Sequence, residues 1–292
     1  MMYKVGISSW STAANGGFEL DEYSFEKLRE ANISAIEISR PADDYRNINY
    51  KEVEALARKY EIDLWSYHLP LRFSPLPEID PSSLDREIRE NTVKYLSELV
   101  KKGADIGIDK FVIHASGEPI RVNREEKMKY AQETLDTLAE LAFQNGAYIC
   151  VEDLPRTCLG NDADDVVKLV SVNDKLKVCF DTNHMLNEDN LRFMEKLADR
   201  IVTVHISDYD FINERHWLPG EGKIDWNALY SKFQEIGYNG VWMYEVSLKC
   251  PKTIIRDRDL NFDDFYKNAM SIFAGERPEV FGKNIENLGM WP

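Results

Sequence analysis

The chain has 292 residues, of which 43% are hydrophobic, and its 36 basic and 51 acidic residues give a net charge of −15. This composition allows a sizeable core, and no apolar run approaches the ~20 residues of a membrane-spanning helix. The acidic balance argues against non-specific nucleic-acid binding, which depends on Lys and Arg contacts to phosphates. The first residues lack a signal-peptide pattern and already resemble a strand, so we expect a cytoplasmic protein.

Short apolar runs alternate with longer amphipathic stretches along the whole chain. The predicted strands lie at 3–9, 33–39, 62–68, 109–115, 147–153, 176–181, 201–207 and 240–246. The predicted helices lie at 19–31, 50–60, 83–106, 123–145, 163–172, 188–198, 225–236 and 261–274. Such alternation predicts a parallel α/β sheet with helical crossovers. Eight strand–helix units favour a closed (β/α)8 TIM barrel, because a doubly wound sheet would not ordinarily show eight units without a domain break.

The chain shows no Pro-, Gly- or Ser-rich linker between these elements. We therefore predict a single TIM-barrel domain over residues 1–292, with 277–292 as a C-terminal tail. The tail is partly apolar, which predicts that it docks either onto the barrel or onto a neighbouring subunit of a homo-oligomer. The segment 69–82 contains four prolines and no periodic pattern, so we expect a long loop after the third strand.

Histidines and acids gather at one end of the predicted strands. The chain has five histidines, and four of them lie at or just past the C-terminal end of a strand, while the fifth lies in the loop after the seventh strand: His68, His114, His184, His205 and His216. The same strand ends carry Glu152, Asp181 and Glu245. Active sites of TIM barrels lie at the C-terminal ends of the strands, so this end is predicted to hold the active site.

Three carboxylates that point into one small cavity would repel one another, and a divalent cation removes that cost. Oxygen ligands with one imidazole suit Mn²⁺, Mg²⁺, Co²⁺ or Zn²⁺. The smallest predicted ligand set takes one residue from each of four consecutive strands: Glu152, Asp181, His205 and Glu245. We therefore predict one divalent metal ion, with open coordination positions for substrate oxygens.

Other candidates have both a functional and a structural interpretation. The loop "HWLPGEGKIDW" (216–226) has the residues of a fixed turn and a helix N-cap at Asp225, and it would hold His216 over the barrel mouth. Glu37 faces inward by strand alternation, either as a substrate contact or as a buried ion pair. Trp10 follows the first strand, either as an apolar wall for a sugar ring or as ordinary packing.

Five ordered motifs carry a resemblance to a known family. The segments "VED" (151–153), "FDTNHM" (180–185), "VHISDYD" (204–210), "HWLPGEGKIDW" (216–226) and "YEV" (244–246) resemble the xylose-isomerase-like TIM barrel superfamily of sugar phosphate isomerases and epimerases. The resemblance extends from the first strand to the last helix. It implies a metal-dependent isomerase or epimerase that acts on a small carbohydrate by proton transfer next to a carbonyl, through an enediolate.

The resemblance also implies roles for individual residues. Glu152 and Glu245 match the two glutamates that transfer the proton and also bind the metal, together with Asp181 and His205. His184 matches a substrate-binding histidine. The other expected substrate contacts are His216, His68, His114, Glu37 and Trp10.

Two positions depart from the ketose 3-epimerase branch of this superfamily. That branch has a substrate-contacting Glu where this chain has Cys158, and an Arg where it has Phe211. The departures argue against a free ketohexose as substrate. They leave hydroxypyruvate isomerases and lyases of the inosose dehydratase type as alternatives.

A further alternative is a trinuclear zinc phosphodiesterase. The chain resembles the type IV apurinic endonucleases at eight ligand positions, namely His68, His114, Glu152, Asp181, His184, His205, His216 and Glu245, and has Glu214 where they have an Asp. The acidic balance argues against a nucleic-acid partner, as does the loop after the second strand (40–44), which lacks the pattern of a basic or aromatic wedge. One metal per chain would support the isomerase or epimerase, and three zinc ions would support the nuclease.

Overall fold

The computed structural model describes residues 2–10, 16–71, 78–285 and 289. Within these residues, eight parallel strands form one sheet in the order β7-β6-β5-β4-β3-β2-β1-β8. The strands are β1 (Lys4–Ser8), β2 (Ala35–Ile38), β3 (Asp63–His68), β4 (Lys110–Ile113), β5 (Tyr148–Glu152), β6 (Lys177–Asp181), β7 (Ile201–His205) and β8 (Val241–Tyr244). A parallel bridge between Ile206 and Tyr244 joins the two edge strands, so the sheet is a TIM barrel, as predicted.

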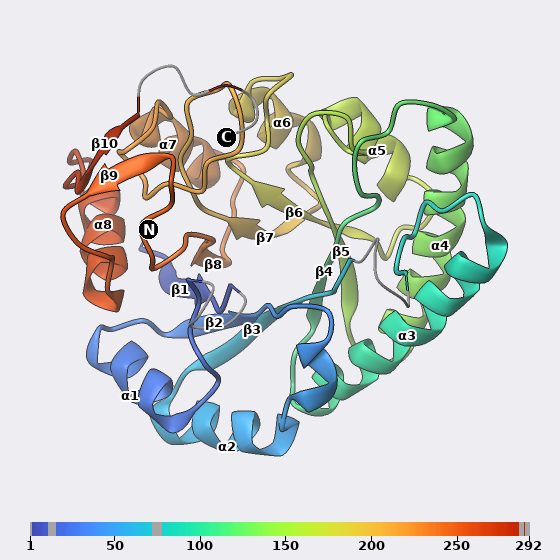
Figure 1. Ribbon diagram of the computed structural model, residues 1–292, viewed down its shortest axis with the longest axis horizontal. Coiled ribbons are helices and arrows are strands. Elements are labelled where there is room, and N and C mark those ends of the chain that lie inside the picture. The colour runs from blue at the N-terminus through green and yellow to red at the C-terminus, as the bar shows by residue number, and fades with distance from the viewer. Residues whose placement is uncertain (1, 11–15, 72–77, 286–288, 290–292) are drawn as a thin grey trace.

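Helices surround the strands on the outside of the barrel (Figure 1). They are α1 (Glu22–Glu30), α2 (Tyr50–Tyr60), α3 (Arg86–Asp105), α4 (Arg124–Gln144), α5 (Ala163–Val170), α6 (Asn190–Leu197), α7 (Trp226–Glu235) and α8 (Phe262–Phe273). Most of them begin at an Asp or Asn whose side chain accepts a backbone N–H of the first turn, as at Asp21, Asn49, Asp85, Asp162, Asp189, Asp225 and Asn261. Each such cap stabilises its helix by about 1 kcal/mol.

The helices bury an apolar face against the outward-facing strand residues, which form one large core. Two smaller apolar clusters lie inside the barrel. One contains Ala35, Val241 and Met243, and the other contains Val112, Cys150 and Cys179. Trp65 packs against the first cluster, so apolar side chains fill the barrel interior below the strand ends, and the polar residues lie at the mouth.

Strand alternation fails at one point of β3. Ile36 pairs with Leu64 and Glu37 pairs with Ser66, so the register skips Trp65. Such a bulge lets two consecutive side chains face the same side of a sheet. Trp65 Nε1 donates a hydrogen bond to Thr203 Oγ1 at 3.1 Å, while Ser66 Oγ bonds Glu37.

The helix α3 starts three residues later than expected, and three described elements, η2 (Asp44–Asn47), β9 (Ile254–Arg256) and β10 (Gly282–Asn284), lie outside the predicted pattern. The first is a short 3-10 helix, which precedes α2. The strands β9 and β10 form an antiparallel pair. This pair attaches part of the tail to the loop after β8, whereas residues 286–288 and 290–292 of the tail and residues 72–77 of the predicted long loop lie outside the described residues.

The part of the chain that the structure describes has no helix with the length and apolar character needed to cross a membrane.

Candidate active site

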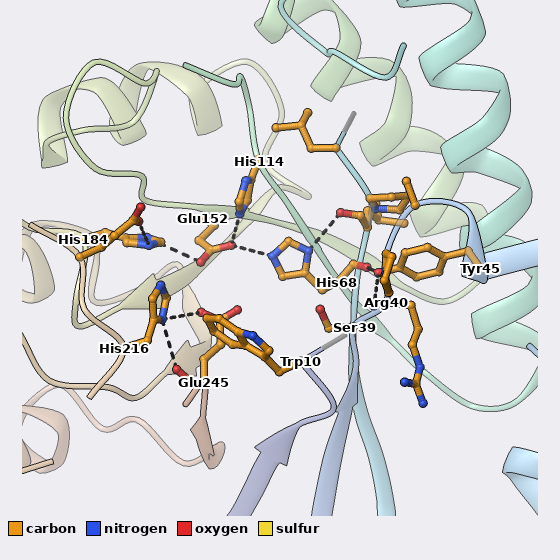
Figure 2. Close-up of a pocket in the computed structure, with 16 residues that line it drawn as sticks. Trp10, Ser39, Arg40, Tyr45, His68, His114, Glu152, His184, His216 and Glu245 are labelled. Atoms are coloured by element: carbon orange, nitrogen blue, oxygen red, sulfur yellow. Dashed lines mark hydrogen bonds and ion pairs between the residues drawn. The ribbon is translucent and has the colours of Figure 1, made fainter. Parts of the chain in front are cut away.

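A cavity of about 690 Å³ opens at the C-terminal ends of the strands (Figure 2). Its walls come from the loops after most of the barrel strands. The described lining residues are Trp10, Ser39, Arg40, Pro41, Ala42, Tyr45, His68, Leu69, Pro70, Leu71, His114, Glu152, His184, Glu214, His216 and Glu245. Seven of the ten residues predicted for the site line this cavity, namely Trp10, His68, His114, Glu152, His184, His216 and Glu245.

The four predicted metal ligands converge at the floor of the cavity. One ligand atom from each of Glu152, Asp181, His205 and Glu245 lies within 4.8 Å of every other. The four side chains come from the ends of β5, β6, β7 and β8 and are all buried. His205 Nδ1 lies 3.0 Å from Glu152 Oε1, 3.4 Å from Glu245 Oε2 and 3.9 Å from the nearer oxygen of Asp181.

The donor set fits a divalent cation. Asp181 Oδ1 accepts the Asn183 backbone N–H at 2.7 Å, but Asp181 Oδ2 is buried without a hydrogen-bond partner among the described residues. A buried carboxylate oxygen without a partner is costly, and a cation is the group that would satisfy it. Three carboxylates and one imidazole suit Mn²⁺, Mg²⁺, Co²⁺ or Zn²⁺.

The protein alone distributes charge unevenly over the two glutamates. Burial would raise the pKa of Glu152, but the charges and hydrogen bonds of His205 and His114 hold that pKa well below its usual range. Burial raises the pKa of Glu245 well above its usual range, opposed by the charge of His205 and reinforced by that of Glu152. A low dielectric and neighbouring charges of both signs therefore govern protonation at this floor.

Glu37 lies beneath this cluster and is fully buried, away from the described cavity wall. Its Oε2 lies 3.0 Å from His205 Nε2 and accepts a hydrogen bond from Ser66 Oγ at 2.8 Å. With Nε2–H donating to Glu37, the other ring nitrogen of His205 faces Glu152 and Asp181 and would be the one to bind a cation. The position of Glu37 matches the buried ion pair more closely than the substrate contact.

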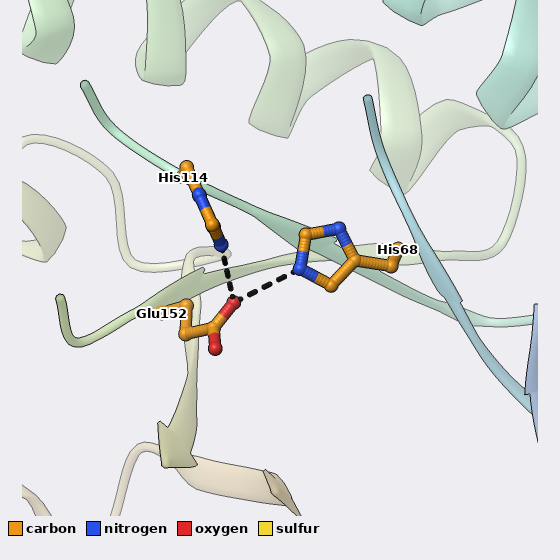
Figure 3. Close-up of side chains that lie close together, drawn as sticks. All are labelled: His68, His114 and Glu152. Carbon is orange, nitrogen blue, oxygen red and sulfur yellow. Dashed lines mark hydrogen bonds and ion pairs between the residues drawn. The ribbon is translucent and has the colours of Figure 1, made fainter. Parts of the chain in front are cut away.

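Two further clusters adjoin the floor. His68 Nε2 and His114 Nε2 lie 3.1 Å and 3.0 Å from the same oxygen of Glu152 (Figure 3). On the other side, His184, Glu214 and His216 bring ligand atoms within 4.8 Å of one another, with His184 Nε2 3.2 Å from Glu214 Oε2. Each of the two clusters has the residue types of a metal site, as the floor has.

Backbone carbonyls orient three of the histidines. Nδ1 of His68 lies 3.0 Å from the Leu69 carbonyl, and Nδ1 of His184 lies 2.8 Å from the Asp153 carbonyl. Nδ1 of His216 lies 3.2 Å from the Glu245 carbonyl. Because a carbonyl only accepts, Nδ1 carries a proton in each of these rings, while Nε2 of His68 faces Glu152 and Nε2 of His184 faces Glu214.

Trp10 and Arg40 complete the wall. The Trp10 and His216 rings meet edge to face at 4.6 Å, which places the indole beside the floor of the cavity. Sequence reasoning missed Arg40, whose guanidinium Nη1 lies 3.5 Å from Glu19. In Figure 2 the Arg40 side chain points away from Glu152, so its charge is directed toward another part of the surface.

Asp208 organises the loop that carries His216, and sequence reasoning missed it. Its carboxylate accepts hydrogen bonds from the backbone N–H groups of Tyr209, Gly220 and Ile224 and from the indole of Trp226. The backbones of Asp208 and Trp217 also pair. The one sequence signal for Asp208 is its place in the "VHISDYD" motif, three residues after His205. The motif does not reveal its hydrogen-bond partners, which lie up to 18 residues away in the chain.

Gly222 is required by this arrangement. A Cβ at this position would lie 2.2 Å from Asp208 Oδ1 and 2.4 Å from the Tyr209 carbonyl oxygen. We expect Gly222→Ala to lower the free energy of unfolding by about 1–3 kcal/mol, as overpacking does, and to raise KM because His216 shifts. Denaturant titration and steady-state kinetics measure the two effects.

Gly107→Ala is the matched control. Gly107 has a φ of +90° and nothing within 4 Å of an added Cβ, so alanine adds backbone strain of about 1 kcal/mol without steric contact. The control should lower stability and leave KM unchanged. Equal KM for the Gly222→Ala variant and the control would contradict the role given to the loop.

The chain is similar to known proteins. The D-psicose 3-epimerase of Ruminiclostridium cellulolyticum is 26% identical over 251 residues, which cover 80% of this chain and 80% of that protein. The probable endonuclease 4 of Finegoldia magna is 28% identical over 165 residues, which cover 50% of this chain and 58% of that protein. The first relative is a sugar epimerase and the second is named as a nuclease, so both predicted alternatives have a counterpart.

Solved structures and the family profile agree on the fold. A structure of D-psicose 3-epimerase in the presence of D-fructose superposes with a TM-score of 0.75 at 20% identity, and covers 94% of this chain and 100% of that one. At this identity the likeness shows the fold alone. The profile of the family described as xylose isomerase-like TIM barrel matches residues 25–261. The chain therefore belongs to the xylose isomerase-like TIM barrel family.

Proposed function

We propose that this chain is a divalent-metal-dependent sugar epimerase or isomerase. The observation that carries the proposal is the floor of the cavity, where two glutamates converge with Asp181 and His205 within 4.8 Å. The similarity to a sugar 3-epimerase over 80% of the chain supports the same class. The cavity of about 690 Å³ has room for a monosaccharide, and half of its described lining residues are histidines, glutamates and a tryptophan.

Glu152, Asp181, His205 and Glu245 would hold the metal ion. When bound, the ion acts as a Lewis acid that polarises the substrate carbonyl and stabilises developing negative charge on oxygen. Glu37 keeps His205 in the tautomer that such a site requires, through the 3.0 Å contact to Nε2.

Glu152 and Glu245 are the groups that would move the proton. In the proposed step, one carboxylate removes a proton from the carbon next to the carbonyl, and an enediolate forms. The other glutamate returns a proton to that carbon for epimerisation, or to the neighbouring carbon for isomerisation. Both side chains line the cavity and both lie within 3.4 Å of the same His205 nitrogen, which supports a shared reacting centre.

The surrounding side chains would bind the sugar. His184 and His216 line one side of the cavity and would contact substrate hydroxyls there, and His68 and His114, whose Nε2 atoms also lie 3.1 Å and 3.0 Å from Glu152, would do so on the other side. Trp10 offers an apolar face for the carbon skeleton. Cys158 and Phe211 lie off the described cavity wall, so any hydroxyl contacts made at those positions in ketose 3-epimerases must come from elsewhere.

A substrate panel tests the proposal. The chain is loaded with Mn²⁺, Co²⁺, Mg²⁺ or Zn²⁺ and incubated with free and phosphorylated ketoses and with an inosose, and products are separated by chromatography. We expect reversible conversion of at least one ketose into its epimer or aldose. Loss of water from the inosose, with every ketose unchanged, would favour a lyase instead.

A second candidate function is a metal-dependent phosphodiesterase. The observation that favours it is the presence of three adjoining clusters with metal-ligand residue types, together with the partial similarity to a probable endonuclease 4. Incision of an oligonucleotide with one abasic site by the Zn²⁺-loaded chain tests it. Under the epimerase proposal the oligonucleotide stays intact.

A further inference from the structure

Arg156 joins three loops at the rim of the cavity. It lies in the loop after β5 and has a φ of 53°, and its side chain is only 8% exposed. Its guanidinium donates to Glu118 in the loop after β4, and to Asn213 and Glu214 in the loop after β7. The residue is absent from the predicted site, because its three partners lie 38 to 58 residues away in sequence.

The contacts of Arg156 occupy most of its donors. Nε lies 2.8 Å and 3.0 Å from the two oxygens of Glu118, and Nη1 lies 2.5 Å from Asn213 Oδ1. Nη2 donates to Glu214 Oε1 at 2.6 Å and also contacts Glu118. A guanidinium stays charged in proteins, so a permanent positive charge lies beside Glu214.

Glu214 is held between this charge and the histidines of the cavity. Its Oε1 faces Arg156, and its Oε2 lies 3.2 Å from His184 Nε2. Burial would raise the pKa of Glu214, but the His184 hydrogen bond and the charges of His184, His216 and Arg156 hold it well below its usual range. Glu214 is therefore an ionised carboxylate that already has a cationic partner.

This pairing bears on the outer cluster of His184, Glu214 and His216. The cluster has the residue types of a metal site, and its ligand atoms lie within 4.8 Å of one another. A divalent cation bound there would share Glu214 with Arg156, and the two positive charges would repel each other across one carboxylate. Arg156 also keeps one of the two Glu214 oxygens from turning to a metal. Both effects lower the affinity of the outer cluster for a second ion.

We propose that Arg156 sets the metal content of this site. Its guanidinium supplies the positive charge beside Glu214 that a second metal ion would otherwise supply. His184, Glu214 and His216 therefore stay free of metal and are available to bind substrate oxygens. The assignment of these three residues to substrate oxygens rests on the proposed function. The effect of Arg156 on metal binding does not, since it follows from the contacts of the cluster itself.

Metal content is measured on apo chains dialysed to equilibrium against Zn²⁺ and analysed by mass spectrometry. Arg156→Met removes the charge, and Arg156→Gln removes the charge while retaining hydrogen-bond donors, in case the Met variant does not fold. Each variant is expected to bind one Zn²⁺ more per chain than the wild type. Arg156→Lys retains the charge and should keep the wild-type content.

Two controls separate this effect from loop damage. Arg124 donates to the carbonyls of Thr157 and Cys158 in the same loop and pairs with Asp165 rather than with Glu214, so Arg124→Met should leave the content unchanged. The double variant Arg156→Met with Glu214→Gln should lose the additional ion.

The proposal is overturned if both charge-removing variants fold and bind the same number of Zn²⁺ ions as the wild type. It is also overturned if Arg124→Met gains the same ion. The outcome is independent of the substrate panel. A gain of one ion with every ketose unchanged would support the role of Arg156 and contradict the proposed epimerase activity. Ketose turnover without a gain of an ion would support the epimerase activity and contradict the role of Arg156.

Discussion

Replacing Glu152 or Glu245 with Gln is expected to lower kcat/KM by about a thousandfold, within the 10²–10⁴ contribution of acid–base groups. Glutamine keeps the size of the side chain and one oxygen, but it neither accepts nor returns a proton. Glu152 bonds His68, His114 and His205, and an amide can retain part of these contacts. We therefore expect both variants to fold and to lose turnover.

Steady-state kinetics on the ketose that the panel identifies measures the loss, and circular dichroism checks the fold. The control is Glu140→Gln on α4, which removes a surface ion pair with Lys175 and should keep wild-type kcat/KM. Exposed pairs of this kind contribute little to stability. Wild-type turnover in both site variants would remove the proposed catalytic role of the two glutamates.

Asp181→Asn is expected to weaken metal binding by about a hundredfold or more. Replacing a residue that only hydrogen-bonds to a metal ligand already lowers metal affinity by about 10- to 100-fold, and Asp181 would be a ligand itself. The amide oxygen can still accept the Asn183 N–H that Asp181 Oδ1 accepts at 2.7 Å. The amide NH₂ would then replace Oδ2, the buried oxygen for which no hydrogen-bond partner is described. The substitution removes one negative charge and one ligand atom with little change in shape.

Calorimetric titration of the apo chain with Mn²⁺ measures the dissociation constant. Asp174→Asn is the control, because the Asp174 side chain is fully exposed and pairs with Arg200 far from the cavity. An Asp181→Asn variant that binds Mn²⁺ as tightly as the control would exclude Asp181 from the metal site.

Much of the site could be predicted because it depends on local patterns. Strand alternation places His205 and Glu152 on the inner face, and the parallel sheet brings all strand ends to one rim. The prediction of which residues meet at the floor needed only these two facts. Strand alternation does not describe Trp65, because a bulge in β3 shifts the register there. Such a bulge depends on the pairing with the neighbouring strand, so the sequence of β3 alone does not reveal it.

The residues that hold the site together could not be predicted in the same way. Arg156 and Asp208 act through side chains of other loops, and a sequence does not show which loops meet. Glu37 left two interpretations open for the same reason, since its partner His205 is 168 residues away. The pairing of β9 with β10 was also missed, because both strands have three residues and no alternating pattern.

The central claim is proton transfer at the carbon next to a carbonyl, between Glu152, Glu245 and the substrate. The most direct measurement is turnover of the active ketose in D₂O, with the product analysed by nuclear magnetic resonance. The account predicts product with one deuterium on the carbon next to the carbonyl, because carboxyl protons exchange with solvent before they are returned. Complete conversion to product without deuterium at that carbon would contradict the account.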